Sequence, residues 1–161
     1  MHTICHTDIG RYMSDNFQSD ASGQGRKFEE ICNDILIAKG FTLLGSKIIT
    51  RLGIEVDQVA ISGNNETYWF EFKGSWKGRR PGMIRTDTTK KGLCNALLAH
   101  VDTISHPKFI IMSSHLPKPD SSGDNMCKIA KNSGALYDLI CVFDLNDVNR
   151  YSNDLNRLLR L

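Results

Sequence analysis

Three ionisable residues in the middle of the chain, Asp57, Glu71 and Lys73, have the types and spacing that metal-assisted chemistry needs. Two carboxylates held close together repel each other unless a hard cation neutralises both, and Mg²⁺ prefers oxygen ligands of this kind. Such an ion polarises a phosphoryl oxygen and lowers the pKa of a bound water. With Lys73 orienting that water and offsetting negative charge, the set predicts phosphodiester hydrolysis.

Two strand-like segments have to bring these residues together. Residues 54–62 alternate between apolar and polar side chains, and residues 67–73 are rich in aromatic residues. The Gly-Asn-Asn sequence between them predicts an antiparallel hairpin. Because side chains alternate between the faces of a strand, Glu71 and Lys73 are expected to point the same way.

Asp57 is expected on a strand face that it shares with Val59 and Ile61. An unpaired carboxylate buried there would cost several kcal/mol, so it needs a cation or strong hydrogen-bond donors. We therefore predict that Asp57 and Glu71 converge as the two protein ligands of Mg²⁺. The alternative is that Glu71 and Lys73 lie on the solvated face of an amphipathic strand.

The rest of the chain reads as alternating helices and strands. An amphipathic helix is expected from Phe28, with Gly40 ending it. The other expected elements are a strand at 41–50, a helix at 87–105 with an apolar seam of Leu93, Leu97, Val101 and Ile104, a buried strand at 108–112, a helix through Met126, Ile129 and Ala130, a buried strand at 138–143 and a last helix with Val148, Tyr151, Leu155 and Leu158 on one side. This order predicts an α/β fold with a mixed sheet and helices on both faces. Residues 1–24 are expected to form an N-terminal arm or lead-in, and residues 25–161 a single domain.

Asp57 followed by Glu71-Phe72-Lys73 resembles the D…(D/E)-x-K signature of the PD-(D/E)xK, or restriction-endonuclease-like, nuclease superfamily. In that superfamily the first acid lies in one hairpin strand and the (D/E)-x-K lies on the next. The resemblance covers residues 25 to about 115 and implies an αβββαβ core, followed here by C-terminal additions. One departure is Val56, which stands where the nominal motif has a proline that is not a ligand.

The stretch Gly25-Arg26-Lys27-Phe28-Glu29 resembles the opening helix of resolvase-like and Mrr-like members of the superfamily. Their helical glutamate maps onto Glu29, with Glu30 as the substitute. The resemblance therefore adds Glu29 to the expected catalytic set of Asp57, Glu71 and Lys73.

A basic segment follows the expected site. Residues 73–91 contain seven lysines and arginines against one acid, Asp87. Such a cluster can neutralise DNA phosphates, although a solvated loop is the alternative. The segment from Thr86 is read first as a helix N-cap, a position that can also bind phosphate, and residues 85–91 resemble a segment after the active site of some restriction enzymes. The expected DNA-binding residues are Lys77, Arg79, Arg80, Arg85, Thr86, Lys90 and Lys91.

Composition sets weaker limits. The 161 residues carry a net charge of only +2, so overall charge says little about partners. Five scattered cysteines without a C-x-x-C pair favour a reducing compartment, and the start of the chain lacks the pattern of a signal peptide. No apolar run is long enough to span a membrane. A cytoplasmic location is therefore expected.

These observations together predict a Mg²⁺-dependent endonuclease that cuts double-stranded DNA, of restriction type. A single small domain is expected to act as a homodimer, or as a small strand-nicking subunit beside a larger specificity subunit. One alternative is a Holliday-junction resolvase or a repair-type nicking nuclease. Another is a non-catalytic DNA-binding subunit on a nuclease-like scaffold.

Overall fold

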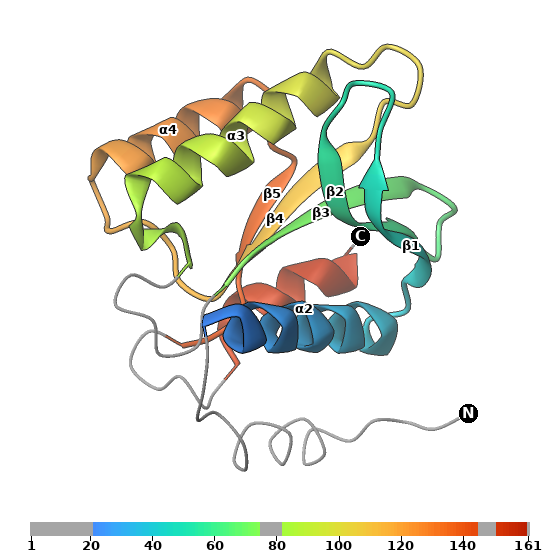
Figure 1. The fold of residues 1–161 in the computed structure, drawn as a ribbon, viewed down its shortest axis with the longest axis horizontal. Helices are drawn as coiled ribbons and strands as arrows, with labels where there is room; N and C mark the ends of the chain where they lie inside the picture. The colour runs from blue at the N-terminus through green and yellow to red at the C-terminus, as the bar shows by residue number, and fades with distance from the viewer. Residues whose placement is uncertain (1–20, 75–81, 145–150, 161) are drawn as a thin grey trace.

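A computed structural model gives the fold of the chain at residues 21–74, 82–144 and 151–160 (Figure 1). The helices and strands in these ranges follow in the order α2 (Ala21–Ala38), β1 (Thr42–Ile49), β2 (Glu55–Ile61), β3 (Thr67–Lys73), the 3₁₀ turn η1 (Gly82–Ile84), α3 (Thr86–His100), β4 (Lys108–Ser113), α4 (Ser122–Asn132), β5 (Asp138–Cys141) and the 3₁₀ helix η2 (Asn153–Arg160).

The five strands form one mixed sheet in the order β1-β2-β3-β4-β5. β1, β2 and β3 are antiparallel neighbours, whereas β3, β4 and β5 run parallel. The helices cover both faces: α2 and η2 lie on one side of the sheet, and α3 and α4 lie side by side on the other (Figure 1). The expected α/β class, the αβββαβ order with C-terminal additions and the antiparallel hairpin are confirmed.

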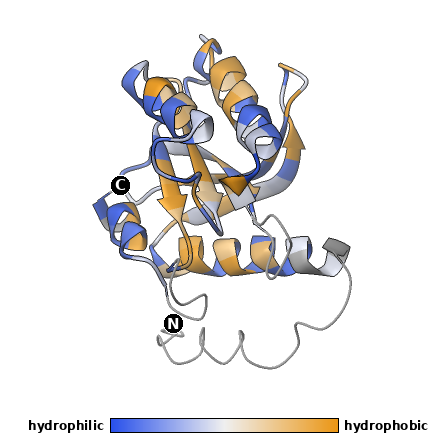
Figure 2. Cartoon of the chain, turned by 90° about the vertical axis from the view of Figure 1, so that its left-hand side faces the viewer, coloured by the Kyte–Doolittle hydropathy of each residue, from blue (hydrophilic) through white to orange (hydrophobic). Residues whose placement is uncertain are grey.

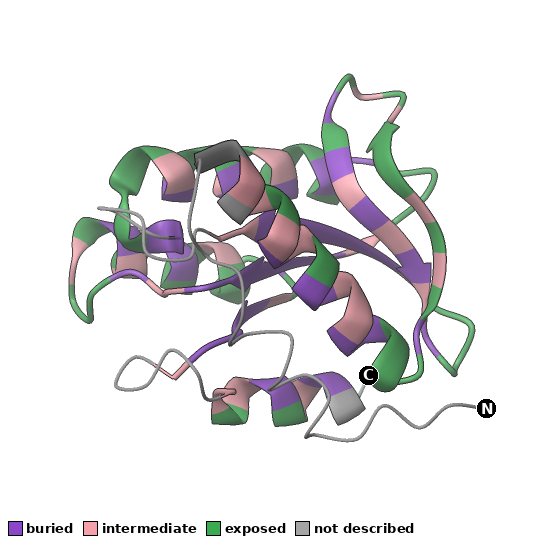
Figure 3. Ribbon diagram, turned by 60° about the horizontal axis from the view of Figure 1, so that its bottom comes forward, coloured by how far each residue is buried: buried purple, intermediate pink, exposed green. Residues whose placement is uncertain are grey.

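The central strands carry the core between the two helical layers. They are drawn in hydrophobic colours in Figure 2 and as largely buried in Figure 3. Phe70 and Phe72 of β3 pack on the α2 side with Phe28, while Trp69 packs on the α3 side with Ala96. β3 is therefore covered on both faces, and its alternate residues face different helices, as expected from the pleat.

The opening helix α2 buries the side chains that its period predicts, namely Phe28, Ile31, Cys32, Ile35 and Leu36. It ends before Gly40, whose φ of +89° suits a residue without a Cβ. The helix begins at Ala21, so residues 21–24 of the expected lead-in form its first turn. The rest of that lead-in, residues 1–20, lies outside the described residues.

Helix α3 corrects the sequence prediction in length and in orientation. It ends at His100, and the expected seam is wrong at three of its four positions, because Leu97, Val101 and Ile104 are 55%, 58% and 75% exposed. Leu93 is half-buried and packs against the core as expected. The face that packs on the sheet consists of small residues, which let the helix backbone approach β4 closely: Thr89, Gly92, Ala96 and Ala99.

The helix expected through Met126, Ile129 and Ala130 is present as α4. Ile129 is 68% exposed, whereas Ala130 packs against the core together with the buried Cys127. The last helix is a 3₁₀ helix that buries Leu155 and Leu158 as expected. Val148 lies outside the described residues.

The described part of the chain has two features that bear on its surroundings. Its cysteines at 32, 94, 127 and 141 are all free. Within the same residues, no helix combines the length and the apolar character that crossing a bilayer requires.

A buried carboxylate organises the turn after α3. Asp102 is 1% exposed and accepts the backbone N–H groups of Ile104 at 2.9 Å and Ser105 at 3.3 Å. It also accepts the Ser105 hydroxyl and contacts the guanidinium of Arg51, from the turn between β1 and β2. These donors, the Ser105 hydroxyl first, hold the pKa of Asp102 well below its usual range. Asp102 thus ties the β1–β2 hairpin to the end of α3.

We expect Asp102→Asn to lower the thermal unfolding midpoint by several degrees at neutral pH. Because the folded pKa is depressed, this stabilisation is present above the unfolded pKa of about 3.9 and is lost as the pH falls below it. Thermal unfolding of both chains from about pH 3 to about pH 8 measures the effect. The difference should shrink from roughly pH 5 downward, and a difference independent of pH would contradict this role for the charge.

Candidate active site

Asp57 lies where the ladder between β2 and β3 stops. The regular pairing of the two strands runs from Ile61 opposite Thr67 to Gln58 opposite Phe70. One residue further, the Asp57 carboxylate accepts the backbone N–H of Phe72 at 2.6 Å. A side-chain oxygen thus replaces a backbone partner and fixes Asp57 against the last residues of β3.

Glu71 contacts Asn95 of α3 and is only 3% exposed. Its Oε1 accepts the Asn95 amide at 3.3 Å and also contacts the Lys73 ammonium. Its Oε2 is buried, and among the described residues it has no hydrogen-bond partner. Burying a carboxylate oxygen without a partner is costly, so Oε2 is the atom in this region that most needs a cation or donor.

Lys73 ends β3 and is held there through its backbone. Its carbonyl accepts the Ser113 hydroxyl at 2.8 Å and the Ser114 N–H at 3.2 Å. Its side chain runs past Gly92 of α3, where a Cβ would lie 3.9 Å from Lys73 Cε and 3.0 Å from Ile111 Cδ1. The Lys73 ammonium is therefore positioned by the parallel strand β4, which holds the Lys73 backbone, and by α3, which has a glycine where the Lys73 side chain passes.

The two acids share an unfavourable electrostatic environment. Burial raises the pKa of Asp57, and the Phe72 N–H and Lys73 counteract it only in part. Burial also raises the pKa of Glu71; Lys73 lowers it, and the charge of Asp57 raises it further. A cation between the acids would offset both the burial and the repulsion.

These carboxylates suit one hard cation that takes only a few of its ligands from the protein. In residues 21–74, 82–144 and 151–160, no three His, Cys, Asp or Glu side chains gather closely enough to hold a metal ion. Mg²⁺ commonly binds one or two carboxylates and keeps water and substrate oxygens as its other ligands. The two carboxylates of Asp57 and Glu71, the latter with its unpartnered Oε2, match that pattern.

Glu29 lies on α2. Its carboxylate is 3.5 Å from the ammonium of Lys47 on β1, whose charge also acts on Asp57. The buried Cys32 thiol lies near both acids: burial raises its pKa most, and the charges of Asp57 and Glu29 raise it further. The structure therefore places Glu29 in the neighbourhood of Asp57.

The expected DNA-binding residues fall into two groups. Lys77, Arg79 and Arg80 lie outside the described residues. Of the others, Lys90 and Lys91 are exposed at the start of α3, while Arg85 makes two hydrogen bonds to Asp87, at 3.0 and 2.8 Å.

The expected N-cap at Thr86 is wrong by one residue. Arg85 occupies the cap position and makes no side-chain cap, and Thr86 is the first residue of the helix. Thr89 is buried, and its hydroxyl donates to the carbonyls of Met83 and Arg85, at 2.9 and 3.1 Å.

Sequence reasoning missed Asn95 and Ser113. Asn95 lies three residues after Gly92 and next to Ala96, so a correct placement of the small-residue face of α3 would have turned it towards the sheet. Ser113 ends a buried apolar strand, and its hydroxyl contacts backbone groups of the distant Lys73 and Met83. Its role could not be inferred from local pattern.

Comparison with known proteins leaves the family open. No family model and no curated protein matches the chain. Among solved structures, a repair endonuclease from Pyrococcus abyssi matches with 13% identity and a TM-score of 0.45, over 78% of this chain and 48% of that one. A complex of EndoMS with double-stranded DNA matches with 14% identity and a TM-score of 0.44, over 78% and 47%. The chain thus spans about half the length of both structures, and at these TM-scores the function has to be inferred from the site itself.

Proposed function

We propose that this chain is a Mg²⁺-dependent endonuclease that hydrolyses phosphodiester bonds of double-stranded DNA at Asp57, Glu71 and Lys73. The observation that carries the proposal is the buried Oε2 of Glu71, which has no partner among the described residues and belongs to a carboxylate close to Asp57. A buried carboxylate close to a half-buried one, with one lysine at the carboxyl end of a β-strand, is costly for the fold, and metal-assisted hydrolysis is a use that accounts for it.

Each residue has a separate task in this proposal. Asp57 and Glu71 would hold Mg²⁺, which supplies Lewis acidity at the phosphoryl oxygen and a bound water of lowered pKa. Lys73 keeps its ammonium beside Glu71 and offsets the negative charge that develops on the phosphate in the transition state. Lys90 and Lys91 are exposed on the first turns of α3, where they can contact the DNA backbone.

We further propose that two copies, or one copy and a larger subunit, act together in a restriction-type enzyme. One site per chain cuts one strand, so cleavage of both strands requires a second site. Whether the enzyme reads a sequence, a junction or a mismatch decides between restriction and repair-type nicking.

Plasmid cleavage with Mg²⁺ or EDTA tests the proposal. We expect Mg²⁺-dependent nicking or discrete bands from the native chain, and a loss of about a hundredfold or more with Asp57→Ala and with Lys73→Ala. Lys118→Ala, an exposed lysine in the loop before α4, is the control and should cleave like the native chain. Cleavage that survives both site substitutions would refute the assignment.

The same assay on linear, branched and mismatched duplexes distinguishes the substrate classes. Discrete products from linear DNA indicate sequence-specific cutting, and preference for a junction or a mismatch indicates the repair-type alternative. No cleavage of any of these substrates, together with retained DNA binding, would favour a non-catalytic subunit.

Asn95 gives a second prediction, because its amide occupies the same Glu71 oxygen as Lys73 and so leaves Oε2 for the ion. We expect Asn95→Leu to weaken Mg²⁺ binding by roughly tenfold, in the range seen for partners that orient metal ligands. Titration with Mn²⁺ followed by electron paramagnetic resonance measures binding without turnover. Asn95→Gln should recover part of the affinity, and equal loss in both variants would contradict an orienting role.

A further inference from the structure

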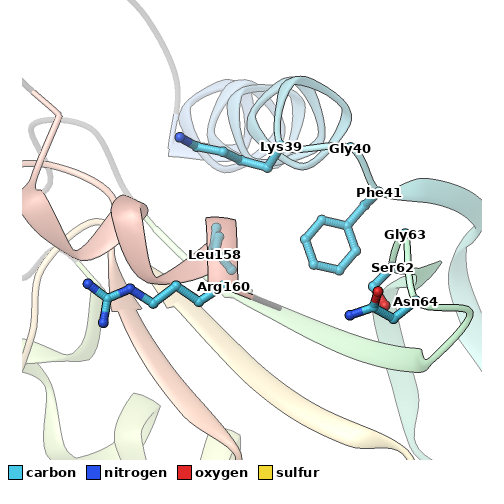
Figure 4. A pocket seen from close by; sticks show the side chains of 8 residues that line it. All are labelled: Lys39, Gly40, Phe41, Ser62, Gly63, Asn64, Leu158 and Arg160. Carbon is cyan, nitrogen blue, oxygen red and sulfur yellow. The ribbon is translucent and has the colours of Figure 1, made fainter.

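A pocket of about 300 Å³ lies away from the candidate active site (Figure 4). It is formed by the end of α2, the turn between β2 and β3, and the end of η2. That turn precedes β3, whereas Lys73 ends β3, so the length of a seven-residue strand, roughly 20 Å, separates the two regions. The pocket lining is Lys39, Gly40, Phe41, Ser62, Gly63, Asn64, Leu158 and Arg160.

Among the described residues that line the pocket, two are positively charged and none is negatively charged. Lys39 lies in the turn directly after α2 and Arg160 ends η2, and both side chains extend to the same side of the pocket in Figure 4. Within the described residues, neither side chain takes part in an ion pair or a hydrogen bond. Most of the other lysines and arginines in the described residues form an ion pair with a carboxylate, as Lys108 does with Glu66 at 2.6 Å.

Unpaired positive charges beside one cavity favour an anionic ligand, because such a ligand gives each of them a partner of opposite charge. The effect is largest for a doubly charged group such as a phosphate monoester, which also has oxygen acceptors for both an ammonium and a guanidinium.

The remaining walls of the pocket suit an organic group attached to that phosphate. Phe41 and Leu158 are apolar and are 5% and 1% exposed. Phe41 is held rigidly, because its ring packs edge-on against Tyr68 and Phe70 with centroids 5.5 and 5.4 Å apart. Ser62 adds a hydroxyl on the opposite side from the cations (Figure 4). A few polar groups around an apolar floor are typical of sites for small molecules.

We propose that this pocket binds a phosphate monoester on a small organic group, of the size of a nucleoside monophosphate, independently of the hydrolytic site. Lys39 and Arg160 hold the phosphate, and the organic group lies against Phe41 and Leu158. The phosphate is supplied by a free nucleotide or by the terminal phosphate of a DNA strand.

Calorimetric titration of the full chain with AMP, at low salt and in EDTA, tests the site. We expect saturable binding by the native chain and roughly tenfold weaker binding by the double variant Lys39→Met/Arg160→Met. The matched control is Arg26→Met/Lys118→Met, which removes one arginine and one lysine that are exposed elsewhere. Thermal unfolding verifies that each variant is folded.

The possible results distinguish this proposal from the proposed nuclease function. No saturable binding of AMP, equal loss in the two double variants, or equal binding of adenosine would overturn the proposal. Asp57→Ala should bind AMP like the native chain whether or not the chain is a nuclease, so failure of the proposed function leaves this result untouched. Displacement of AMP by a 5′-phosphorylated oligonucleotide, but not by its 5′-hydroxyl counterpart, would identify a strand end as the source, and absence of displacement would identify a free nucleotide.

Discussion

Glu71→Gln is expected to reduce Mg²⁺-dependent cleavage by about a thousandfold or more while leaving the fold at least as stable as that of the native chain. In the proposed mechanism Glu71 is a charged ligand of the metal ion, and such an ion contributes several kcal/mol at the transition state, where each 1.36 kcal/mol is a factor of ten in rate. The effect on stability has the opposite sign because the pKa of Glu71 is raised in the folded state, chiefly by burial. At neutral pH its ionisation therefore opposes folding, and a neutral carboxamide removes that cost.

Glu55→Gln is the matched control for this prediction. Glu55 lies on β2 two residues before Asp57, is exposed, and undergoes the same change of charge. Cleavage rates and thermal unfolding midpoints of the three chains give both readouts. Native-like cleavage by Glu71→Gln would remove Glu71 from the site, and a large fall in its midpoint would show that its contact with Lys73 stabilises the fold.

The parts of the fold that could be predicted are those that depend on the types of residues close together in the sequence. The aromatic run of β3 gave the bounds Thr67–Lys73 directly, because such residues suit a strand covered on both faces. Gly40 marks the end of α2 since its left-handed backbone admits few other residues. The hairpin followed from the short polar turn, and the fold class followed from the order of the elements.

Helix α3 shows why the remainder was not predictable. A search for helical periodicity looks for large apolar residues that recur on one face, and it therefore assigns Leu97 and Val101 to the core, although both are exposed. The helix instead packs through Gly92 and Ala96, because only a small face lets its backbone come close to β4. Which face is buried depends on the distance between layers, a tertiary quantity.

The candidate site also has a part that the sequence predicts and a part that only the structure reveals. Asp57, Glu71 and Lys73 were singled out by residue type, and the structure brings them to one end of β3. The contact that positions Asp57 is with the backbone N–H of Phe72. Every residue except proline has such a group, so residue types alone cannot predict this contact. Asn95 and Ser113 act through residues far away along the chain, so only the assembled sheet and helix reveal them. The expected roles of Lys77, Arg79 and Arg80 stay predictions.

Gly74, the residue after Lys73, links the fold to the site and gives the second large expected effect. A Cβ at this position would lie 1.9 Å from Cδ1 of Phe28 and 2.1 Å from its Cγ. Phe28 is 2% exposed and packs in the core against Phe143, so its ring cannot move freely. We expect Gly74→Ala to cost about 1–3 kcal/mol or more of unfolding free energy. Because relief by the backbone would also displace Lys73, cleavage should fall by about a hundredfold.

Denaturant unfolding and cleavage of Gly74→Ala, each compared with Gly25→Ala, test this prediction. Gly25 lies inside α2 with nothing within 4 Å of an added Cβ, so the same substitution there should stabilise the chain by up to about 1 kcal/mol through helix propensity. Combining Gly74→Ala with Phe28→Leu gives a sharper readout, because the smaller side chain makes room for the new methyl group. The double variant should be more stable than the sum of the two single losses predicts. Simple additivity, or native-like stability of Gly74→Ala, would mean that the glycine is not required by contact with Phe28.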